Sequence, residues 1–494
     1  MPAEPREIEL KLEIDPAHVD SLKAHDQLST LPSRTLSQIT TYYDTPKETL
    51  RGAGYALRVR QAGRKRVQTL KGSGNASAAI FDRAEWERRI DGPDPDLAAL
   101  SDTPVAGLLA KTEGADLGPL FTARVKRTLW RIEDAAGEIE MVLDEGEIIS
   151  NGQRAPVREV ELELVKGDPQ SLFALARTLA ITAPLKIGVL TKYERGLMLR
   201  DGAIGQPVKA FAVPLVPGMT AGAAFQAIAL SCIRQFRLNE PLFAEARDGA
   251  ALHQARVALR RLRSAFSIFA AITAEEGRGD IREGLRWISS ILGEPRDLDV
   301  FVNKSTRAGP GWQDVQALAL TARDEAFDMA IAALGSLRFQ TLMLDLVEWL
   351  AFGPWRASDQ LERAGRDQPV ELFAHTVLDR FWRKVKKRGR NLGQLADEPR
   401  HELRIVAKKL RYGSEFFAAL YTGKKAARRH KAFLAALEEL QTYLGDLNDI
   451  VTASALDARF PGLHDAGVAV DRAALKAAAE AAMLRLADAK PFWR

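Results

Sequence analysis

The chain has 494 residues and a single cysteine, Cys232, so no disulfide can link two parts of it and a reducing compartment suits it. No uninterrupted apolar run approaches the roughly 20 residues that a membrane-spanning helix needs. The first ten residues carry charges where a secretory signal would have an apolar segment. We therefore expect a cytoplasmic protein without a membrane partner.

Signatures of two common phosphate-binding classes are also missing. The loop G-x-x-x-x-G-K-[ST] does not occur, because the nearest glycine-rich piece, Gly72-Ser73-Gly74, is too short and lacks the lysine. No zinc finger or RNA-binding signature occurs, and few aromatic residues lie near the basic segments to stack on bases. A P-loop enzyme and a nucleic-acid partner are therefore not expected.

The length is sufficient for two or more domains, and a hydrophobic content of 46% is normal for a globular protein. Residues 1–217 hold 29 Lys and Arg against 31 Asp and Glu, a net charge of −2, whereas residues 218–494 hold 41 against 34, a net charge of +7. The second part is the better candidate for a polyanion partner, although a solvated basic surface would give the same balance.

Residues 1–200 have the short alternating segments and turn-rich separators of a β-structure. The predicted strands are Glu7–Ile14, Ala56–Gln61, Arg66–Lys71, Ala84–Ile90, Leu129–Glu133, Ile139–Leu143 and Val157–Val165. Asn151-Gly152 predicts a hairpin turn, and the regular spacing indicates an antiparallel barrel or sandwich. Two helices are expected near Pro16–Leu28 and Pro169–Ala180. Residues 201–217, rich in Pro and Gly, are predicted to be a linker.

From residue 218 onward the apolar residues recur every three or four positions, as in amphipathic helices. This part also repeats itself. His253-x-x-Arg256-x-x-x-Arg260-Arg261-Leu262-Arg263 returns as His401-x-x-Arg404-x-x-x-Lys408-Lys409-Leu410-Arg411, and each copy is followed by a second motif, at Leu292-Gly293 and at Leu444-Gly445. We predict two homologous helical bundles in tandem, residues 218–365 and 366–494.

The first strand carries two carboxylates and an ammonium on one face, because Glu7, Glu9 and Lys11 are separated by two residues each. Later strands repeat this with Arg58 and Arg60, Glu85 and Glu87, and Glu161 and Glu163, while Asp144 adds a carboxylate near a strand end. One such strand would be an ordinary wet face. The segregation of acidic from basic strands instead favours a charged interior that binds divalent metal and phosphate.

In each copy of the repeated motif the basic residues follow one side of a helix. At 100° per residue, His253, Arg256, Arg260 and Arg263 fall within about an 80° sector, opposite an apolar face. Apart from Glu415, four residues after Arg411, neither stripe has the glutamates at i+4 that usually offset such charge. The stripes therefore favour a polyanion surface, and the surrounding cations favour phosphate over metal as the partner of the histidines.

The ordered motifs of residues 1–200 resemble the CYTH superfamily, the triphosphate tunnel metalloenzymes. The resemblance is carried by Glu7-Ile8-Glu9-Leu10-Lys11, the E-x-E-x-K of that family, and by eight further motifs. These are Tyr42-Tyr43-Asp44-Thr45, Leu57-Arg58-x-Arg60, Thr69-Leu70-Lys71, Arg83-x-Glu85-Trp86-Glu87, Arg124-x-x-Arg127, Asp144-x-Gly146, Glu161-Leu162-Glu163-Leu164 and Lys192-Tyr193-Glu194-Arg195-Gly196. The resemblance implies an eight-stranded antiparallel barrel that forms a tunnel, with flanking helices.

The same resemblance implies roles for individual residues. The ligands of Mg²⁺ or Mn²⁺ would be Glu7, Glu9, Asp144, Glu161 and Glu163. The triphosphate would be held by Lys11, Arg58, Arg60, Lys71, Arg83, Arg124 and Lys192. The catalytic residues would be Glu85, Glu87, Glu163 and Lys192, with Glu87 or Glu163 taking a proton from the attacking water. Arg127 and Arg195 would join the phosphate-holding set if they lie on the inner face, which the pattern does not fix.

Residues 218–494 are similar to the CHAD domain, a helical module rich in His, Arg and Lys that often follows a CYTH domain. The similarity implies binding of inorganic polyphosphate, and hence an association with polyphosphate granules, through the two stripes. Their residues are His253, Arg256, Arg260, Arg261, Arg263, His401, Arg404, Lys408, Lys409 and Arg411.

These resemblances favour hydrolysis of inorganic triphosphate to pyrophosphate and phosphate by a metal-dependent enzyme that also binds polyphosphate. A thiamine triphosphatase, a class IV type adenylate cyclase and a non-enzymatic polyphosphate-binding protein remain open. The predicted fold class is multidomain α+β, with a barrel in residues 1–200 and all-α bundles in residues 218–494.

Overall fold

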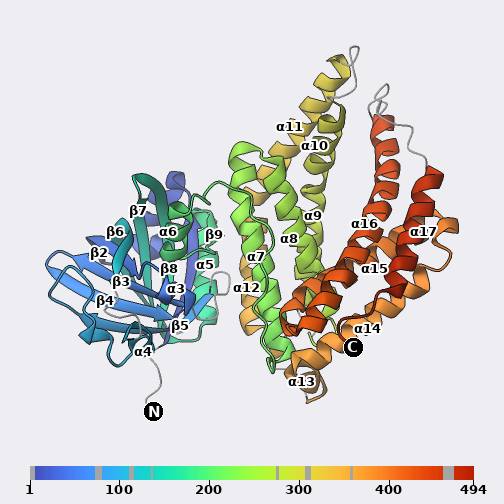
Figure 1. Cartoon of the computed structure of the whole chain (residues 1–494). Coiled ribbons are helices and arrows are strands. Elements are labelled where there is room, and N and C mark those ends of the chain that lie inside the picture. Colours follow the sequence, from blue (N-terminus) through green and yellow to red (C-terminus); the bar gives the residue numbers. More distant parts are fainter. Residues whose placement is uncertain are drawn as a thin grey trace. The chain divides into compact units, whose positions relative to one another are not determined.

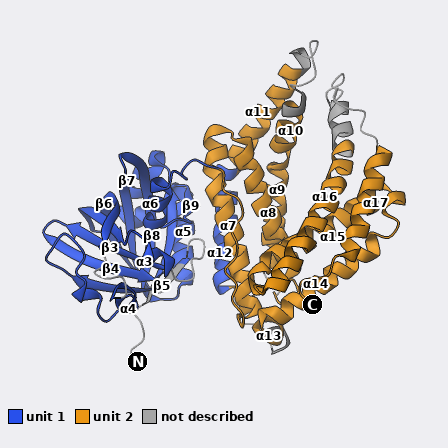
Figure 2. Ribbon diagram, viewed as in Figure 1, with its two compact units in different colours: residues 1–206, 334–352 blue, residues 207–333, 353–494 orange. Residues whose placement is uncertain are grey.

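The structure is a computed structural model that describes residues 6–72, 80–110, 116–134, 137–273, 277–305, 313–356, 360–459 and 472–494. Side chains are described in these ranges except at residues 6–7, 81–83, 303–305, 313–315, 360–362 and 451–459. The chain forms two compact units (Figures 1 and 2). The first contains residues 1–206 and 334–352, and the second contains residues 207–333 and 353–494.

In the described residues of the first unit, nine strands form one antiparallel sheet. They are β1 (Arg6–Ile14), β2 (Ser33–Asp44), β3 (Tyr55–Ala62), β4 (Lys65–Gly72), β5 (Ile80–Arg89), β6 (Gly118–Asp134), β7 (Gly137–Ser150), β8 (Gln153–Gly167) and β9 (Leu185–Ile187). The hydrogen-bonded order is β5-β4-β3-β2-β6-β7-β8-β1-β9, and β5 also pairs with β1. Because β5 pairs with β1, strands β1 to β8 form a closed sheet, which confirms the predicted barrel. The ninth strand pairs with the end of β1.

The tight hairpin between β7 and β8 has the predicted turn. Asn151 and Gly152 have φ values of 48° and 78°, so both central residues are left-handed, as a two-residue turn between twisted strands requires. In contrast, β2 was not predicted. Its buried positions include Gln38 and Thr40, so the strand lacks the alternation of apolar and polar residues that reveals a strand in sequence.

Apolar side chains fill one end of the barrel interior. This cluster joins Tyr42, Phe121, Ala123, Val125, Ile148, Ala155 and Val157 of the strands to Leu197 and Leu199 of α6 (Lys192–Arg200). The helix begins with a capping box between Thr191 and Glu194. It packs so closely that a Cβ on Gly196 would lie 2.0 Å from Cε2 of Phe121. The beginning of α6 is thereby fixed beside the charged part of the interior.

Short helices connect the strands of the barrel, and one longer helix packs on its side. The short ones are α1 (Val19–Lys23), α2 (Asp26–Ser29), α3 (Thr49–Gly52) and α4 (Ala106–Ala110), and the longer one is α5 (Gln170–Thr182). The predicted helices near Pro16–Leu28 and Pro169–Ala180 are thus present. Asp44 fixes the start of α3, because its carboxylate accepts hydrogen bonds from the amides of Leu50 and Arg51, each at 2.9 Å.

One helix from the second part of the sequence, α12 (Leu337–Phe352), belongs to the first unit. Arg177 of α5 donates a 2.7 Å hydrogen bond to Asp345 and another to Glu348, and Gln340 accepts one from the amide of Leu185 at 3.3 Å. The predicted division into residues 1–200 and 218–494 does not place this helix in the first unit. Figure 2 shows α12 in the blue of that unit.

The described part of the second unit is helical. Its helices are α7 (Ala221–Ala246), α8 (Gly249–Ile268), α9 (Arg278–Ile291), α10 (Gly293–Ser305), most of α11 (Gln313–Gly335), α13 (Gln360–Asp367), α14 (Val370–Arg388), α15 (Asp397–Phe416), α16 (Lys424–Arg459) and α17 (Arg472–Asp488). The first copy of the repeated motif lies on α8 and the second on α15. Their predicted apolar faces, including Leu262 and Leu410, are buried. The multidomain α+β class is therefore confirmed.

Within the described residues, no single helix is long and apolar enough to cross a membrane. The bent pair Gln316–Gly335 and Leu337–Arg356 reaches the required length and composition only when taken together.

Candidate active site and basic helical surface

The strand register places acidic residues of β1, β8 and β7 side by side on the interior face. Lys11 is the register partner of Glu161, and Glu159 is the partner of both Glu13 and Asp144. One step along the barrel, Glu163 is the partner of Glu9 and of Glu140. The middle of this wall is shielded from solvent, since Asp144 and Glu159 are fully buried, while Glu161 and Glu163 are partly exposed.

Two lysines lie between these carboxylates. The Nζ of Lys192, at the first position of α6, lies 2.8 Å from Asp144, 2.7 Å from Glu159 and 2.9 Å from Glu161. Lys11 forms ion pairs with Glu159 at 3.3 Å and with Glu161. Burial alone would lower the pKa of Lys192, but the three carboxylates raise it well above the usual value of 10.5. Both lysines are therefore charged near neutral pH, because the pKa of Lys11 is raised as well.

The carboxylates of the cluster are ionised for the same reason. Burial would raise the pKa of Glu161, but Lys11, Lys192 and Arg127 hold it well below its usual range. The pKa values of Asp144 and Glu159 are also lowered, in each case by neighbouring cations that outweigh burial. The acidic wall is therefore a charged network in which each carboxylate contacts at least one cation.

The facing strands β3, β4 and β5 form a basic wall. Glu85 accepts from Lys71 at 2.7 Å and from Arg58 at 3.4 Å, while Glu87 accepts from the hydroxyl of Thr69 at 3.1 Å. Arg58, burial and Arg127 together lower the pKa of Arg60 to about 10. Cations that destabilise one another in this way would be stabilised by an anion placed between them.

The prediction that Arg124 of β6 holds the triphosphate needs correction. Arg124 lies on the outer face and is exposed, because the neighbouring Ala123 and Val125 take the inward positions. The inward arginine is Arg127, which donates to Asp144 at 2.8 and 2.6 Å and to Glu161 at 3.0 Å. Arg127, rather than Arg124, is thus the β6 residue in the candidate site.

One further residue of the site, Glu159, was not singled out in the sequence, and the inner-face position of Arg195 was left open. Glu159 contacts Lys11, Lys192 and Arg195, the last at 3.5 Å. Arg195 also donates to Glu13 at 2.8 Å. The signal for Glu159 was present in the alternation of β8, because it shares a face with Glu161 and Glu163.

The remaining predicted residues are placed only in part. Glu7 and Arg83 are register partners in β1 and β5, but their side chains lie outside the described part of the chain. Glu9 is buried, and Glu163 is partly buried beside it. The structure thus brings together Lys11, Asp144, Glu161 and Lys192 in one cluster, and Arg58, Lys71 and Glu85 in a second.

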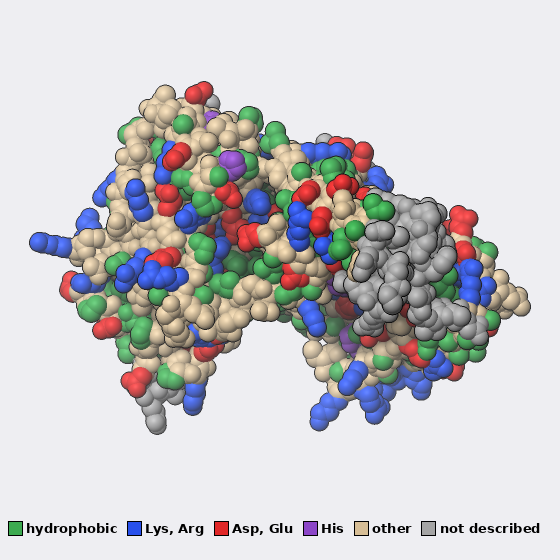
Figure 3. All heavy atoms as spheres, turned by 90° about the horizontal axis from the view of Figure 1, so that it is seen from above, with side chains coloured by type: hydrophobic (Ala, Val, Ile, Leu, Met, Phe, Trp, Pro, Cys, Tyr) green, Lys and Arg blue, Asp and Glu red, His purple; other side chains and the backbone are tan. Residues whose placement is uncertain are grey.

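The basic stripes of α8 and α15 form a common electrostatic environment in the second unit. Arg260 is close enough to Arg404 and Lys408 to lower the pKa of each, after the larger effect of burial. The pKa of Lys408 falls to about 7. Four buried guanidinium nitrogens of these two stripes have no hydrogen-bond partner among the described residues: Nη1 of Arg256 and Nε of Arg260, Arg404 and Arg411. Figure 3 shows lysine and arginine side chains gathered along one edge of this unit.

Carboxylates balance only part of this charge. Arg256 lies 3.9 Å from Asp297, and the pKa of Asp297 is raised by burial and by Asp449, its equivalent in the second repeat. His401 contacts the side-chain oxygen of Asn448 at 3.0 Å.

The prediction that Arg261 belongs to this surface is wrong. Arg261 is buried, forms an ion pair with Glu415 and lies over the ring of Phe416, 4.9 Å from its centroid. Its position on α8, about 80° from His253, turns it toward α15 instead.

Comparison with known families matches each part of the chain. Residues 5–197 match the CYTH domain, and residues 227–456 match the CHAD domain. Residues 5–197 are thus similar to a CYTH domain and residues 227–456 to a CHAD domain. The CYTH match covers the barrel with α5 and the first part of α6, and the CHAD match covers α8 and α15 with both copies of the repeated motif.

Three relatives can be named. Over 197 residues the chain is 32% identical to the inorganic triphosphatase of Haemophilus influenzae, a match that covers 39% of this chain and 55% of that protein. The chain thus aligns with about half the length of this curated relative. The CHAD domain from the plant Ricinus communis is 26% identical, with a TM-score of 0.46, over 58% of this chain and 94% of that chain. A Hippeastrum protein, described as an adenylyl cyclase with a dominant triphosphatase activity, is 22% identical, with a TM-score of 0.33, over 40% of this chain and 96% of that one.

The acidic wall of the barrel interior presents carboxylate oxygens, the ligands that Mg²⁺ and Mn²⁺ prefer. Among the described residues, no three His, Cys, Asp or Glu side chains are grouped to hold a metal ion, since Asp144 and Glu161 contact Lys192 and Arg127. The donor chemistry fits a hard cation, and the neighbouring pair Glu9 and Glu163 would hold it.

Proposed function

We propose that the CYTH domain hydrolyses inorganic triphosphate to pyrophosphate and phosphate with Mg²⁺ or Mn²⁺ bound, and that the CHAD domain binds inorganic polyphosphate. The observation that carries the first proposal is the closed barrel with Arg58, Arg60 and Lys71 on one wall and buried carboxylates on another. Such an interior has little value as a structural core, since charges inside a protein are costly unless they are paired. It suits a ligand with several negative charges that is bound together with a cation.

In this proposal the basic wall holds the oxygens of the phosphate chain, with Arg58 and Arg60 able to contact two oxygens each. Lys11 and Lys192 keep their protons at neutral pH, because their pKa values are raised, so they donate to phosphate or carboxylate but do not serve as bases. Metal bound at Glu9 and Glu163 would neutralise phosphate charge during the displacement.

Two carboxylates are candidates for accepting the proton of the attacking water, as the sequence indicated. Glu87 accepts one hydrogen bond, from Thr69, and Glu163 lies beside Glu9 at the edge of the acidic wall. Glu161 is the weaker candidate, because the low pKa imposed by Lys11, Lys192 and Arg127 makes it a poor base.

The experiment is phosphate release by the full-length protein from triphosphate, ATP and thiamine triphosphate, each with Mg²⁺, with Mn²⁺ and with a chelator. Arg60→Ala removes a charged phosphate contact of about 1.5–3 kcal/mol, so kcat/KM for triphosphate should fall about 10- to 100-fold. Arg124→Ala, which removes the same side chain from the outer face of the same barrel, is the control and should leave kcat/KM unchanged. Equal activity of Arg60→Ala and Arg124→Ala would remove the basic wall from the mechanism. A preference for ATP or thiamine triphosphate would overturn the substrate.

The second proposal is supported by the stripes of α8 and α15, where buried guanidinium nitrogens lack partners among the described residues. A chain of phosphates would supply acceptors along the whole stripe. Polyphosphate binding to the full-length protein should weaken with salt, and Arg260→Ala should reduce the slope of log K against log salt by roughly one. Arg485→Ala, which removes an arginine paired with Glu439 at 2.6 Å, is the control. An unchanged slope in Arg260→Ala would contradict the assignment.

A further inference from the structure

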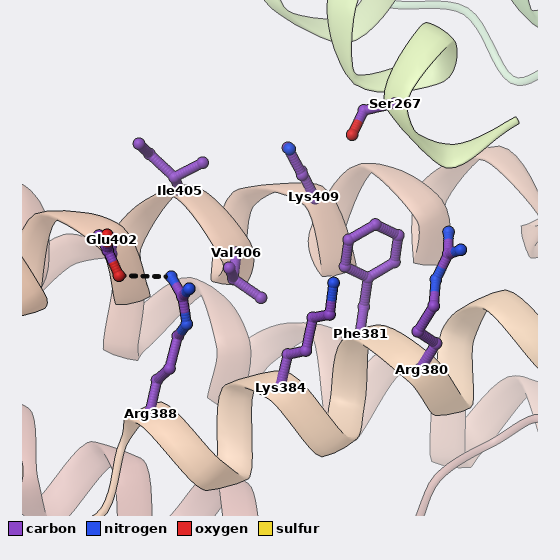
Figure 4. Close-up of a pocket in the computed structure, with 9 residues that line it drawn as sticks. All are labelled: Ser267, Arg380, Phe381, Lys384, Arg388, Glu402, Ile405, Val406 and Lys409. Carbon is purple, nitrogen blue, oxygen red and sulfur yellow. Dashed lines mark ion pairs between the residues drawn. The ribbon is translucent and has the colours of Figure 1, made fainter. Parts of the chain in front are cut away.

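A second charged feature of the helical unit adjoins these stripes and includes Lys409 from the predicted stripe set. Between α14 and α15 is a groove of about 390 Å³, lined also by Ser267 of α8. Its other lining residues are Arg380, Phe381, Lys384 and Arg388 of α14, and Glu402, Ile405, Val406 and Lys409 of α15 (Figure 4). The volume is in the range of small-ligand sites. Three of the four α14 residues are cations that the sequence motifs did not mark.

One end of the groove is strongly cationic. Figure 4 shows Lys409, Lys384 and Arg380 around the same space, with the hydroxyl of Ser267 beside Lys409. The pKa of Lys409 is lowered first by burial and then by four nearby cations, Lys384, Arg282, the stripe residue Arg263 and Arg380. The Nε of Arg380 is buried and has no hydrogen-bond partner among the described residues. No carboxylate lines this end of the groove in the described structure, so an anion is the missing counter-charge.

The other end has a different character. Val406 and Ile405 present apolar surface there, and Ile405 is 41% exposed. Beyond them Arg388 and Glu402 form an ion pair at 2.9 Å, which supplies both hydrogen-bond donors and acceptors. The groove is thus cationic at one end and apolar, with a polar rim, at the other.

We propose that this groove binds a nucleotide, with its phosphates between Arg380, Lys384 and Lys409 and its nucleoside over Ile405 and Val406. The edge of the base or ribose would meet the Arg388–Glu402 pair. The proposal goes beyond the function above, because it assigns a different ligand, a nucleotide, to a groove that the second copy of the motif does not share with the first.

The repeat argues that the groove is separate from the duplicated basic surface. Lys409 corresponds to Arg261 in the first copy, and Arg261 is buried in an ion pair with Glu415. Only the second copy, among the described residues, opens this position to a cationic groove. Because only the second copy has this site, a ligand that binds both stripes does not explain it. An inorganic polyphosphate chain would also leave Ile405 and Val406 without a partner.

The test is calorimetric titration of the full-length protein with ATP, inorganic triphosphate and adenosine. The Arg60→Ala background weakens binding in the barrel, and a chelator prevents metal-dependent turnover. ATP should bind more tightly than triphosphate or adenosine, since only ATP engages both ends. Lys409→Ala and Lys384→Ala should each weaken ATP binding about 10-fold or more, the effect of losing one charged hydrogen bond. Ile405→Asp should weaken ATP binding while it leaves triphosphate binding within about twofold.

Arg383→Ala is the matched control, because Arg383 is exposed on α14 but does not line the groove. It should bind ATP like the parent, and Lys384→Ala and Ile405→Asp should retain polyphosphate binding by the stripes. Triphosphate binding as tight as that of ATP would overturn the nucleotide assignment. Unchanged ATP affinity in Lys409→Ala and Lys384→Ala would overturn the site itself. Loss of polyphosphate binding in Lys384→Ala or Ile405→Asp would merge the groove with the stripes and also overturn the proposal.

Discussion

The charged network of the barrel makes a specific prediction for Glu159→Gln. The substitution keeps the shape of the side chain but removes one negative charge from a fully buried position. In the parent, this carboxylate lies within 3.5 Å of Lys11, Lys192 and Arg195. Glutamine would leave these three cations with less compensating charge in a region that water does not reach.

The magnitude follows from the burial of the network. Removing one partner from a buried ion pair costs about 3–5 kcal/mol. Because the amide still accepts hydrogen bonds, we expect about 3 kcal/mol for Glu159→Gln. For a unit of this size, 1 kcal/mol corresponds to about 2–4 °C. The melting temperature of the barrel should therefore fall by about 6–12 °C at pH 7.

The pH dependence of this loss has a defined sign. The folded-state pKa of Glu159 lies below the usual value of 4.5, because Lys11, Lys192 and Arg195 outweigh burial. A carboxylate with a lowered pKa contributes stability above its unfolded pKa and loses it as the pH falls through the folded value. The parent and Glu159→Gln should therefore differ fully at pH 7 and converge as the pH falls below 4.5.

The assay is differential scanning calorimetry of the full-length proteins between pH 3 and pH 7, with the barrel transition followed separately. Glu145→Gln is the control, because Glu145 pairs with Lys23 at 2.8 Å in a partly exposed position, where such a pair contributes about 1 kcal/mol or less. Equal shifts in the two variants, or a difference that does not shrink at low pH, would refute the buried-network reasoning.

Three further predictions concern other parts of the chain. Because the pKa of Lys408 is about 7, polyphosphate binding should be accompanied by proton uptake, and the affinity should fall as the pH rises from 6 to 8. Lys408→Arg should make the affinity less dependent on pH. An identical pH profile in the variant would exclude Lys408 from the site. Gly196→Ala should lower the melting temperature by an amount corresponding to about 1–3 kcal/mol, because its Cβ would clash with Phe121. Gly107→Ala, at a position with open space around it, should leave the melting temperature unchanged. Equal melting temperatures of the two variants would contradict the packing of Gly196 against Phe121. Arg177→Ala should speed hydrogen exchange in α12 by loosening its contacts with Asp345 and Glu348, and unaltered exchange would count against them.

Much of the barrel could be predicted because a strand puts every second residue on the same face. Glu9, Lys11, Glu161 and Asp144 were found in this way, and all four lie in or beside the charged interior. The rule fails where the interior is not charged. Arg124 was assigned to the triphosphate through the Arg124-x-x-Arg127 motif of the resemblance, but Ala123 and Val125 belong to the apolar end of the interior, so Arg124 faces outward.

Other features depend on packing that a one-dimensional pattern does not contain. The heptad-like spacing of α8 identifies its buried face, but the direction of Arg261 depends on Glu415, which is 154 residues away. The groove of α14 and α15 was missed for the same reason, because Arg380, Lys384 and Lys409 come together only when two helices pack. The metal ligands and the polyphosphate contacts stay predictions.

The assignment of α12 to the first unit affects how fragments of this protein should be designed. A fragment that stops at residue 206 would end before the helix that covers α5 and β9, and Phe173, which contacts Phe352, would meet water. The complementary fragment would carry α12 as an orphan apolar helix, prone to self-association. Expression of the first unit alone therefore requires Leu337–Phe352 to be attached, and expression of the second unit alone requires this helix to be replaced. Aggregation of a simple truncation would reflect the misplaced helix rather than a defect in catalysis or anion binding.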